Sequence, residues 1–514
     1  MKKLVITLIL GLIFVPVSIQ AAAKTQKEAE AQVASVLLKL ANRDLANDYF
    51  GWDIYIPAAS KLINKALQDF PKSMYLHKKL QNLTLGILSD GRLSIDKKPI
   101  RDSLVSYYKK LYDDNPNSEF YLYLYGRVAD DMQATLKLAE TAIKKNKKSY
   151  WAYILQGETL MDLRRYKDAE KALLKAVKLK PNFLDTYSDL ASLYYFLEQP
   201  EKAVRNALKA CELTPHYSLV RYPYYFGKMA GEKLEDKEIL VDLERAYYKK
   251  FTEDREEDYY AIYNVTEELY NAYLNIAQED SARLYLAYMD AFATPLGKGD
   301  MVNLNGAILE ASFEHKDAAL KLLRKAFDKG FYNYGRINDI PEFEFFKDDP
   351  ELKNILEDMK TKAQKELIAG LTNNPAPDFT LPTTEGDSVS LSKLKGKMVL
   401  LDFWGIGCGP CYRLMPVLER FYQTHKSEVY MYGIESWNNS AEDVIATAKK
   451  LKIAYPNLLG SAKVSQAYGV RGVPHLVIIS PKGKIVHIQH GFAAGKGYAQ
   501  QMFDELEWLL EKSK

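Results

Sequence analysis

Cysteine is scarce in this sequence, and the scarcity limits how the protein can be stabilised. Only three of 514 residues are cysteine, namely Cys211, Cys408 and Cys411. Small secreted domains that depend on disulfides carry several spaced pairs, and a structural zinc site built from cysteine needs more of them within reach. The chain must therefore rely on ordinary hydrophobic cores. At 514 residues it is also too long for a single core, so we expect more than one domain.

A strong excess of charge is missing as well. The formal net charge is +3, and it falls to +1 when Lys2 and Lys3 are removed with the first 23 residues. Domains that bind nucleic acid carry clustered basic residues and a clear positive excess. We therefore expect no nucleic-acid partner.

The N-terminal apolar segment is too short for a membrane span. The run from Leu4 to Ile19 has 16 residues, whereas a spanning helix needs roughly 20. Lys2 and Lys3 precede this run, and the small residues Ala21 to Ala23 follow it. This order is typical of a cleaved signal peptide. We predict that residues 1–23 are a signal peptide and that the protein is exported to the periplasm.

Residues recur at a spacing of 34 positions between 150 and 215. Small side chains at two of the recurring positions allow a pair of helices to cross closely, and a proline ends each pair. The recurring residues are Tyr153, Gly157, Leu160, Ala169, Leu173, Ala176, Leu179 and Pro181, followed 34 positions later by Tyr187, Ala191, Tyr194, Ala203, Ala207, Ala210, Leu213 and Pro215. The pattern resembles the tetratricopeptide (TPR) repeat, a helix pair with the same period.

Two such repeats cannot bury a continuous core, so degenerate neighbours are expected. The spacing of the second helix recurs near both ends of the region, at Ala59, Ile63 and Ala66 and at Ala319, Leu323 and Ala326. We predict an all-α TPR-like solenoid, or two shorter ones joined, followed by an α/β domain. The predicted boundaries are 26–360 for the helical repeats, 361–376 for a helix end and linker, and 377–514 for the α/β domain.

The α/β domain is predicted from its apolar runs and turn signals. An apolar run from Met398 to Phe403 reads as a central strand, and a helix should begin near Cys408. Further along, we expect a parallel strand over 429–434, a helix over 441–451, an antiparallel pair over 476–479 and 485–490, and a closing amphipathic helix over 500–510.

The sequence Cys408-Gly409-Pro410-Cys411 places two thiols at the predicted junction of strand and helix. Unpaired N–H groups and the positive end of the helix dipole point at Cys408, which favours the reactive thiolate. Cys411, one turn further in, should be the more buried thiol. A zinc site would need further ligands, and a structural bridge this short constrains little of the unfolded chain. Cys211, on a repeat helix, is expected to be a small buried hydrophobe.

The residues around this pair resemble the TlpA/ResA-like thiol-disulfide oxidoreductases of the thioredoxin fold. The matching segments cover about a quarter of the chain in the family's order, namely Ala376 to Phe379, Leu391 to Lys397, Leu401 to Gly405, the Cys-Gly-Pro-Cys motif, Pro416, Gly472 to Pro474 and Pro481 to Val486. The resemblance implies a thioredoxin-like domain whose Cys408 and Cys411 form a redox-active disulfide. It implies neither a cofactor nor a metal. A copper-binding role like that of Sco proteins, raised by His475, would need Cys-x-x-x-Cys spacing.

Two carboxylates are candidate proton acceptors by this resemblance. Asp402 matches the buried aspartate of thioredoxins, which can take the proton of Cys411 when that thiol attacks a mixed disulfide. Glu435 matches the acidic residue that ResA-like proteins place near the cysteines. The alternatives are an exposed or strand-end aspartate for Asp402 and a solvated loop residue for Glu435.

The loop around Pro474 matches the family's cis-proline loop. A cis bond there would set the backbone of Val473 opposite the disulfide, where it can pair with an extended substrate. We expect Trp404, Val473 and His475 to bind substrate. The sequence departs from the family at Gly407, where tryptophan usually precedes the first cysteine, and this departure bears on substrate choice.

The predicted function is an exported thiol-disulfide oxidoreductase acting on protein disulfides. The Gly-Pro dipeptide is that of thioredoxin, whose potential of about −270 mV favours a reductase, and a reductase in an oxidising compartment needs a membrane electron donor. The TPR-like region is expected to recruit a protein partner. The alternatives are a disulfide oxidase or isomerase, and a TPR adaptor with a secondary redox role.

Overall fold

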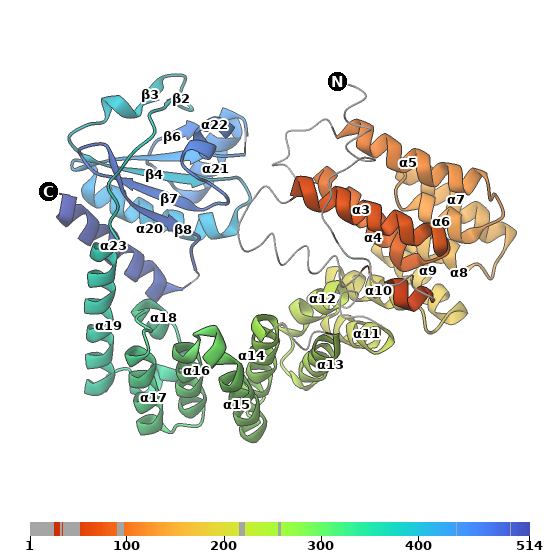
Figure 1. Ribbon diagram of the computed structural model, residues 1–514, viewed down its shortest axis with the longest axis horizontal. Coiled ribbons are helices and arrows are strands. Elements are labelled where there is room, and N and C mark those ends of the chain that lie inside the picture. The colour runs from red at the N-terminus through yellow and green to blue at the C-terminus, as the bar shows by residue number, and fades with distance from the viewer. Residues whose placement is uncertain are drawn as a thin grey trace. The chain divides into compact units, whose positions relative to one another are not determined.

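The computed structural model describes residues 25–30, 33, 52–89, 97–214, 221–254, 259–437, 439–493 and 495–513. The chain divides into two compact units, Met1–Tyr285 and Leu286–Lys514 (Figure 1). The signal peptide predicted over residues 1–23 lies outside the described residues. Within the described residues, no helix has both the length and the apolar composition needed to cross a membrane.

The described part of the first unit is entirely helical, as the repeat pattern predicts. Helices that follow one another in the sequence pack together, most extensively α8 with α9, α10 with α11 and α11 with α12. The helices are α3 (Trp52–Asp69), α4 (Met74–Ser89), α5 (Lys98–Asp113), α6 (Glu119–Gly126), α7 (Met132–Lys145), α8 (Tyr150–Asp162), α9 (Tyr166–Leu179), α10 (Leu184–Phe196), α11 (Pro200–Leu213), α12 (Arg221–Gly231), α13 (Glu238–Asp254), α14 (Tyr259–Asn275) and α15 (Glu279–Leu296), which continues into the second unit.

Small residues account for the close packing of the repeat helices. A Cβ atom at Gly157 in α8 would lie 2.6 Å from side-chain atoms of Leu173 in α9, so the two helices approach only because glycine is present. Ala169 and Ala203 are fully buried at the corresponding contacts. Cys211 is buried and forms no disulfide, and burial raises the pKa of its thiol to about 12. It is therefore the inert buried hydrophobe that the sequence predicts.

The second unit begins with helices that continue the same pattern. Ala319, Leu323 and Ala326 are buried in their common core, as their spacing predicts. Phe343 and Phe346 close this core at its end. The elements are α16 (Gly299–Ser312), α17 (Lys316–Asp328), α18 (Tyr334–Asn338), the 3-10 helix η2 (Pro341–Phe346) and α19 (Pro350–Ala369).

An α/β domain with a six-stranded sheet completes this unit (Figure 1). The strand order is β1-β8-β7-β4-β5-β6, in which β4 lies parallel to β5 and antiparallel to β7. The predicted strand and helix pattern is confirmed. The elements are β1 (Asn374–Pro375), β2 (Thr380–Pro382), β3 (Ser388–Ser390), η3 (Leu391–Lys393), β4 (Met398–Trp404), α20 (Gly409–His425), β5 (Val429–Glu435), α21 (Ala441–Leu451), β6 (Asn457–Leu459), α22 (Ala462–Ala467), β7 (His475–Ile479), β8 (Lys484–His490) and α23 (Lys496–Ser513).

Strand β4 is buried along its whole length because both faces of the sheet are covered. Met398 and Leu400 pack with residues of α20 and α23 on one face. Val399 and Leu401 pack with Phe379, Tyr468 and their neighbours on the other. Successive side chains of a strand alternate between faces, so Asp402 belongs to the face that α20 covers.

The segment predicted as a linker is tied to the sheet. The Thr372 N–H donates to the Val486 carbonyl over 2.9 Å, and β1 pairs with β8. The boundaries proposed for the domains, including 361–376, stay a prediction.

Helix α18 and the first turns of α23 hold each other through backbone and side-chain contacts. The Asp339 carboxylate, just after α18, accepts hydrogen bonds from the N–H groups of Gly497 and Tyr498 at the start of α23, over 2.8 and 3.1 Å. A carboxylate at a helix N-terminus accepts hydrogen bonds from the unpaired N–H groups there and interacts favourably with the positive end of the helix dipole. Tyr334 donates to Asp504, and the Gly335 N–H to Gln501, both over 2.9 Å. The last helices of the repeat pattern thus pack directly against the α/β domain.

Gly335→Ala is expected to loosen this contact. A Cβ atom at Gly335 would lie 2.7 Å from the Gly497 carbonyl oxygen, so the two backbones must separate. Overpacking of this kind costs about 1–3 kcal/mol, equivalent to roughly fivefold to 150-fold faster amide hydrogen exchange in α18 and the start of α23. In the control Gly299→Ala, the added atom meets only the flexible end of Lys329. Equal exchange in both variants would contradict the tight packing described.

Candidate active site

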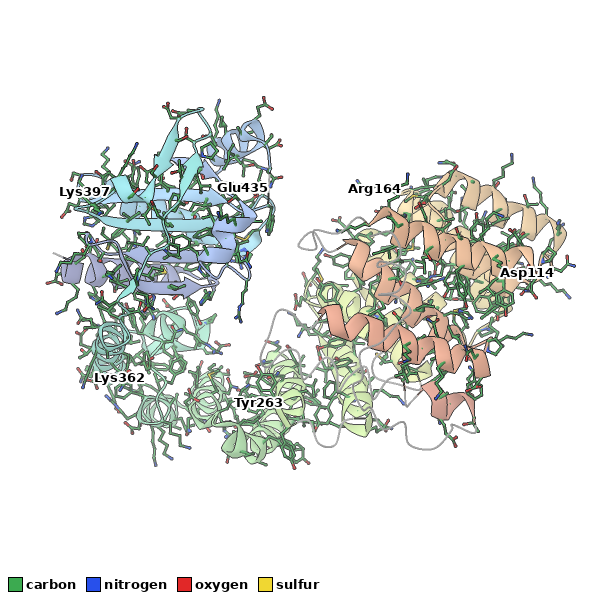
Figure 2. The ribbon with its side chains drawn as sticks, turned by 45° about the horizontal axis from the view of Figure 1, so that its top comes forward. Asp114, Arg164, Tyr263, Lys362, Lys397 and Glu435 are labelled. Carbon is green, nitrogen blue, oxygen red and sulfur yellow. A yellow bond between two sulfur atoms is a disulfide. The ribbon has the colours of Figure 1, made fainter. Side chains whose placement is uncertain are left out.

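The two cysteines lie where the parallel strands β4 and β5 end. Lys397, just before β4, and Glu435, the last residue of β5, lie at opposite ends of these strands (Figure 2). The chain leaves β4 at Trp404 and reaches Cys408 four residues later, at the start of α20. The site therefore occupies the edge of the sheet to which Glu435 belongs.

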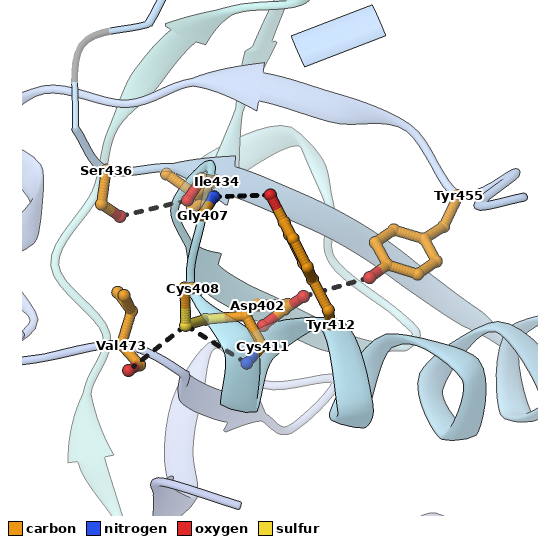
Figure 3. The surroundings of a disulfide bond; sticks show 9 residues. All are labelled: Asp402, Gly407, Cys408, Cys411, Tyr412, Ile434, Ser436, Tyr455 and Val473. Atoms are coloured by element: carbon orange, nitrogen blue, oxygen red, sulfur yellow. Dashed lines mark hydrogen bonds between the residues drawn. A yellow bond between two sulfur atoms is a disulfide. The ribbon is translucent and has the colours of Figure 1, made fainter. Parts of the chain in front are cut away.

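Cys408 and Cys411 are joined by a disulfide with an S–S distance of 2.02 Å (Figure 3). Cys408 is the N-cap of α20, and its sulfur accepts a hydrogen bond from the Cys411 N–H over 3.2 Å. Cys408 is 7% exposed and Cys411 1%, which confirms the predicted order of burial. The N-terminal position favours negative charge on the Cys408 sulfur after the bond is reduced.

The turn before Cys408 explains why glycine stands at position 407. Gly407 has a φ of +90°, a conformation that favours glycine over residues with a Cβ atom. Its N–H donates to the Tyr412 hydroxyl, and the Cys408 N–H donates to the Gly405 carbonyl over 3.1 Å. A tryptophan at this position, as in the family pattern, would be strained in this backbone conformation.

The loop before β7 faces the disulfide. The Val473–Pro474 peptide bond is cis, and the Val473 carbonyl oxygen lies 3.6 Å from the Cys408 sulfur (Figure 3). Val473 is half-buried, and the preceding Gly472 is exposed. A backbone carbonyl is thus present beside the more exposed sulfur.

Asp402 is a buried carboxyl group on the same face of the sheet as α20. It is 1% exposed, and the Tyr455 hydroxyl donates to its Oδ2 over 3.0 Å (Figure 3). Burial raises the pKa of Asp402 to about 7, while the hydrogen bond from Tyr455 works in the opposite direction. The alternative of an exposed Asp402 is wrong. A carboxyl group with this pKa can both accept and release a proton near neutrality.

Glu435 is buried at the end of β5, and neighbouring donors occupy its oxygens. It accepts hydrogen bonds from the N–H groups of Trp437 and Asn439, both over 3.0 Å, and from the Asn439 side chain over 2.8 Å. The alternative of a solvated loop residue is therefore wrong. Through these contacts Glu435 fixes the backbone positions of Trp437 and Asn439 after β5.

Two residues expected to bind substrate are instead part of the core. Trp404 is fully buried, and its indole N–H donates to the Asn457 side chain over 3.0 Å. His475 is also buried, with its ring packed against Phe403 and His490. Burial, with a smaller contribution from His490, lowers the pKa of His475 to about 4, so the ring is neutral at pH 7. Neither side chain can contact a docked substrate in this structure.

Three residues of the site were not predicted from the sequence. Tyr455 reaches Asp402 from 53 positions away, and no local pattern marks such a pairing. Tyr412 accepts a hydrogen bond from the backbone N–H of Gly407, and a contact to the backbone leaves no signal in the side chains of the sequence. Trp437 had a visible signal, since it is an aromatic residue in a polar loop directly after β5.

Known proteins and families are similar to both the α/β domain and the helical repeats of this chain. A model of the AhpC/TSA family matches residues 372–488, and the tetratricopeptide repeat model matches residues 152–183 and 184–217. The thiol-disulfide oxidoreductase ResA of Halalkalibacterium halodurans is 32% identical over 141 residues, covering 26% of this chain and 75% of the relative. ResA of Bacillus subtilis is 36% identical over 134 residues, covering 25% and 72%.

A solved structure is also similar over the same part of the chain. It is the thioredoxin domain of a thiol-disulfide oxidoreductase from Bacteroides vulgatus, at 28% identity. The match covers 27% of this chain and 97% of that domain, with a TM-score of 0.24.

The α/β domain, with its Cys-x-x-Cys pair at the start of a helix, defines a thiol-disulfide oxidoreductase with a thioredoxin-like fold. The similarity to the two ResA proteins extends over most of their length. The chain belongs to the ResA family of thiol-disulfide oxidoreductases, and it carries tetratricopeptide repeats in its N-terminal region. The resemblance drawn from the sequence is thereby confirmed.

Proposed function

We propose that the protein is exported and reduces disulfides of other proteins through Cys408 and Cys411, while its helical repeats recruit a protein partner. The observation that carries the proposal is the position of Cys408. Its sulfur is the more exposed of the pair, caps the N-terminus of α20, and lies beside the Val473 carbonyl.

In the first step, the Cys408 thiolate attacks one sulfur of the substrate disulfide. A bond forms between the Cys408 sulfur and that substrate sulfur, and the other substrate sulfur leaves as a thiolate. The N–H of Cys411 and the dipole of α20 stabilise the charge on Cys408 before the attack. The backbone of Val473 can pair with an extended substrate strand and hold its disulfide in place.

In the second step, Cys411 resolves the mixed disulfide. Asp402 lies beneath α20 and takes the proton of the Cys411 thiol, for which a carboxylate with a pKa of about 7 is suited. The Cys411 thiolate then attacks the Cys408 sulfur and displaces the second substrate thiolate. The substrate disulfide gains two electrons, and the enzyme is left with the Cys408–Cys411 disulfide. A membrane-bound dithiol donor would restore the reduced form.

The helices that follow the two matched repeats offer a surface suited to a protein partner. A groove over α12, α13 and α14 is lined by several tyrosines together with charged residues, including Tyr222, Tyr225, Lys228 and Glu268. Tyr222 and Tyr225 are more than half exposed. Tyrosine supplies a large contact area together with a polar group, which suits protein interfaces.

The reduction potential of the Cys408–Cys411 pair tests the direction of electron flow. We expect a value near or below the −270 mV of thioredoxin when the full chain is equilibrated in dithiothreitol or glutathione buffers. Thiols would be counted by alkylation and mass spectrometry. A Cys211→Ala chain serves as the control, because it removes the only other thiol. A value near −120 mV, that of the oxidant DsbA, would instead make the protein a disulfide donor.

A further inference from the structure

An exposed tryptophan lies next to the cysteine turn. Trp437 is 52% exposed, although tryptophan is usually well buried. Its indole packs flat on the backbone of Gly405, since a Cβ atom there would lie only 2.4–2.8 Å from three of its ring atoms. Gly405 is the first residue after β4, three positions before Cys408. One face of the ring is therefore held against the active-site turn, and the rest is available to solvent.

The backbone on either side of the Trp437 side chain is hydrogen-bonded to β4 and β5. The Trp437 N–H donates to the buried Glu435 carboxylate, which also binds Asn439. The neighbouring Ser436 N–H donates to the Trp404 carbonyl over 2.9 Å. The exposed ring is thus attached to a hydrogen-bonded backbone, so little backbone conformational entropy is lost when a ligand binds to it.

The sheet order places Trp437 on one side of the cysteines and Val473 on the other. Strand β4 lies between β5 and β7. The Cys408 turn follows β4, Trp437 follows β5, and Val473 precedes β7. In the view of Figure 3, Ser436, the neighbour of Trp437, lies above Cys408, and the Val473 carbonyl group lies below it. The turn itself has no side chain at Gly407. Tyr412 contacts it through the hydrogen bond from the Gly407 N–H, and the exposed Trp437 ring against Gly405 forms a second aromatic wall of the turn.

We propose that Trp437 determines substrate specificity. Its exposed ring binds an apolar or aromatic side chain next to the cysteine of an extended substrate peptide, while Val473 pairs with the peptide backbone. The ring packs against Gly405, which leaves room for it because glycine has no side chain. Glu435 is a positioning residue, because it binds the backbone N–H groups of Trp437 and Asn439. This inference rests on the proposed reduction of protein disulfides and specifies which ones are preferred.

The test compares two disulfides reduced by the full-length enzyme. One is oxidised glutathione, and the other is a disulfide-linked dimer of a seven-residue peptide with phenylalanine on both sides of its cysteine. The measured quantity is the ratio of kcat/KM for the peptide to kcat/KM for glutathione. Trp437→Ala is expected to lower this ratio about tenfold, because it removes aromatic contact with the peptide. Trp437→Phe is expected to lower it less than about threefold.

Gly405→Ala supplies a second, independent arm. The added methyl group displaces the ring, so the ratio should fall as in Trp437→Ala. The two substitutions should not add, because the second has no ring left to displace. Phe345→Ala, which removes an equally exposed aromatic residue from η2, is the matched control and should keep the wild-type ratio.

Two results would overturn the inference while leaving the proposed function intact. One is an unchanged ratio in Trp437→Ala, and the other is multiplication of the two effects in the double variant. If the wild-type enzyme reduces neither disulfide, the proposed function itself fails and the inference fails with it.

Discussion

Replacement of Cys408 by serine is expected to abolish disulfide reduction, with a loss of more than about a thousandfold in kcat/KM. A serine hydroxyl is not ionised at pH 7 and cannot form the mixed disulfide. The remaining thiol, Cys411, is almost fully buried and cannot reach a substrate in its place. The measurement is the rate of reduction of a protein disulfide by the full-length enzyme under a dithiol reductant.

Cys411→Ala is the matched counterpart and should fail differently. Cys408 still attacks, but no thiol remains to displace the substrate, so the mixed disulfide accumulates. Incubation with native periplasmic extract should give covalent adducts that disappear on reduction, whereas Cys408→Ser should give none. Adducts with Cys408→Ser, or their absence with Cys411→Ala, would reverse the assigned order of the two thiols or remove their role.

Asp402→Asn is expected to stabilise the protein and to slow its chemistry. The folded pKa of Asp402 is about 7, raised by burial, whereas an aspartate in the unfolded chain titrates near 4. Between these values the folded protein keeps a proton that the unfolded chain has released. Stability is therefore lost as the pH rises from about 4 to 7, by roughly 4 kcal/mol in total. Asparagine resembles the protonated carboxyl group and does not suffer this loss.

The sign of the effect can be read from paired measurements at two pH values. We expect the stability gain of Asp402→Asn over wild type to grow by about 2–3 kcal/mol between pH 5 and pH 8. Amide hydrogen exchange in β4, compared at equal pH, reports this difference. Tyr455→Phe should act in the opposite direction, because loss of its hydrogen bond raises the pKa of Asp402 further. A gain that does not depend on pH would show that Asp402 does not titrate in this range.

The same substitution separates the catalytic role of Asp402 from its effect on stability. Without this proton acceptor, resolution by Cys411 is expected to slow by about a hundredfold near pH 7. Stopped-flow measurement of mixed-disulfide decay would show it. An enzyme that is more stable yet resolves as fast as wild type would exclude Asp402 as the acceptor.

The backbone plan could be predicted from local patterns. The run from Met398 to Phe403 predicted β4 because it is apolar apart from Asp402, as strands buried on both faces are. The recurrence of Gly157 and Ala169 as Ala191 and Ala203 gave the repeat helices, because close crossings require small residues. Cys408 and Cys411 could be ordered by burial because a helix start exposes its first residue and covers the residue one turn later.

Contacts between distant segments could not be predicted. Whether Asp402 is buried depends on α20 covering its face of the sheet, and its partner Tyr455 comes from beyond α21. Trp404 lies four residues before Cys408 and His475 directly follows Pro474, which suggested substrate contact. The alternation of β4 and the pairing of β7 with β8 turn both side chains into the core. Gly407 is a departure in sequence whose cause, a left-handed backbone, is visible only in three dimensions.

The capping of α23 by Asp339 has a consequence for the reach of the enzyme. Asp339, just after α18, is hydrogen-bonded to the start of α23. A longer segment at 370–376 would therefore not allow the α/β domain and its disulfide to move further from α18. Trp508 packs against the α16–α19 core. A fragment that begins at residue 371 lacks this core and would expose the Trp508 side chain to solvent. The smallest piece that can work alone is therefore expected to include α16 to α19 as well as the α/β domain, so that the redox centre and these helices form one structural unit.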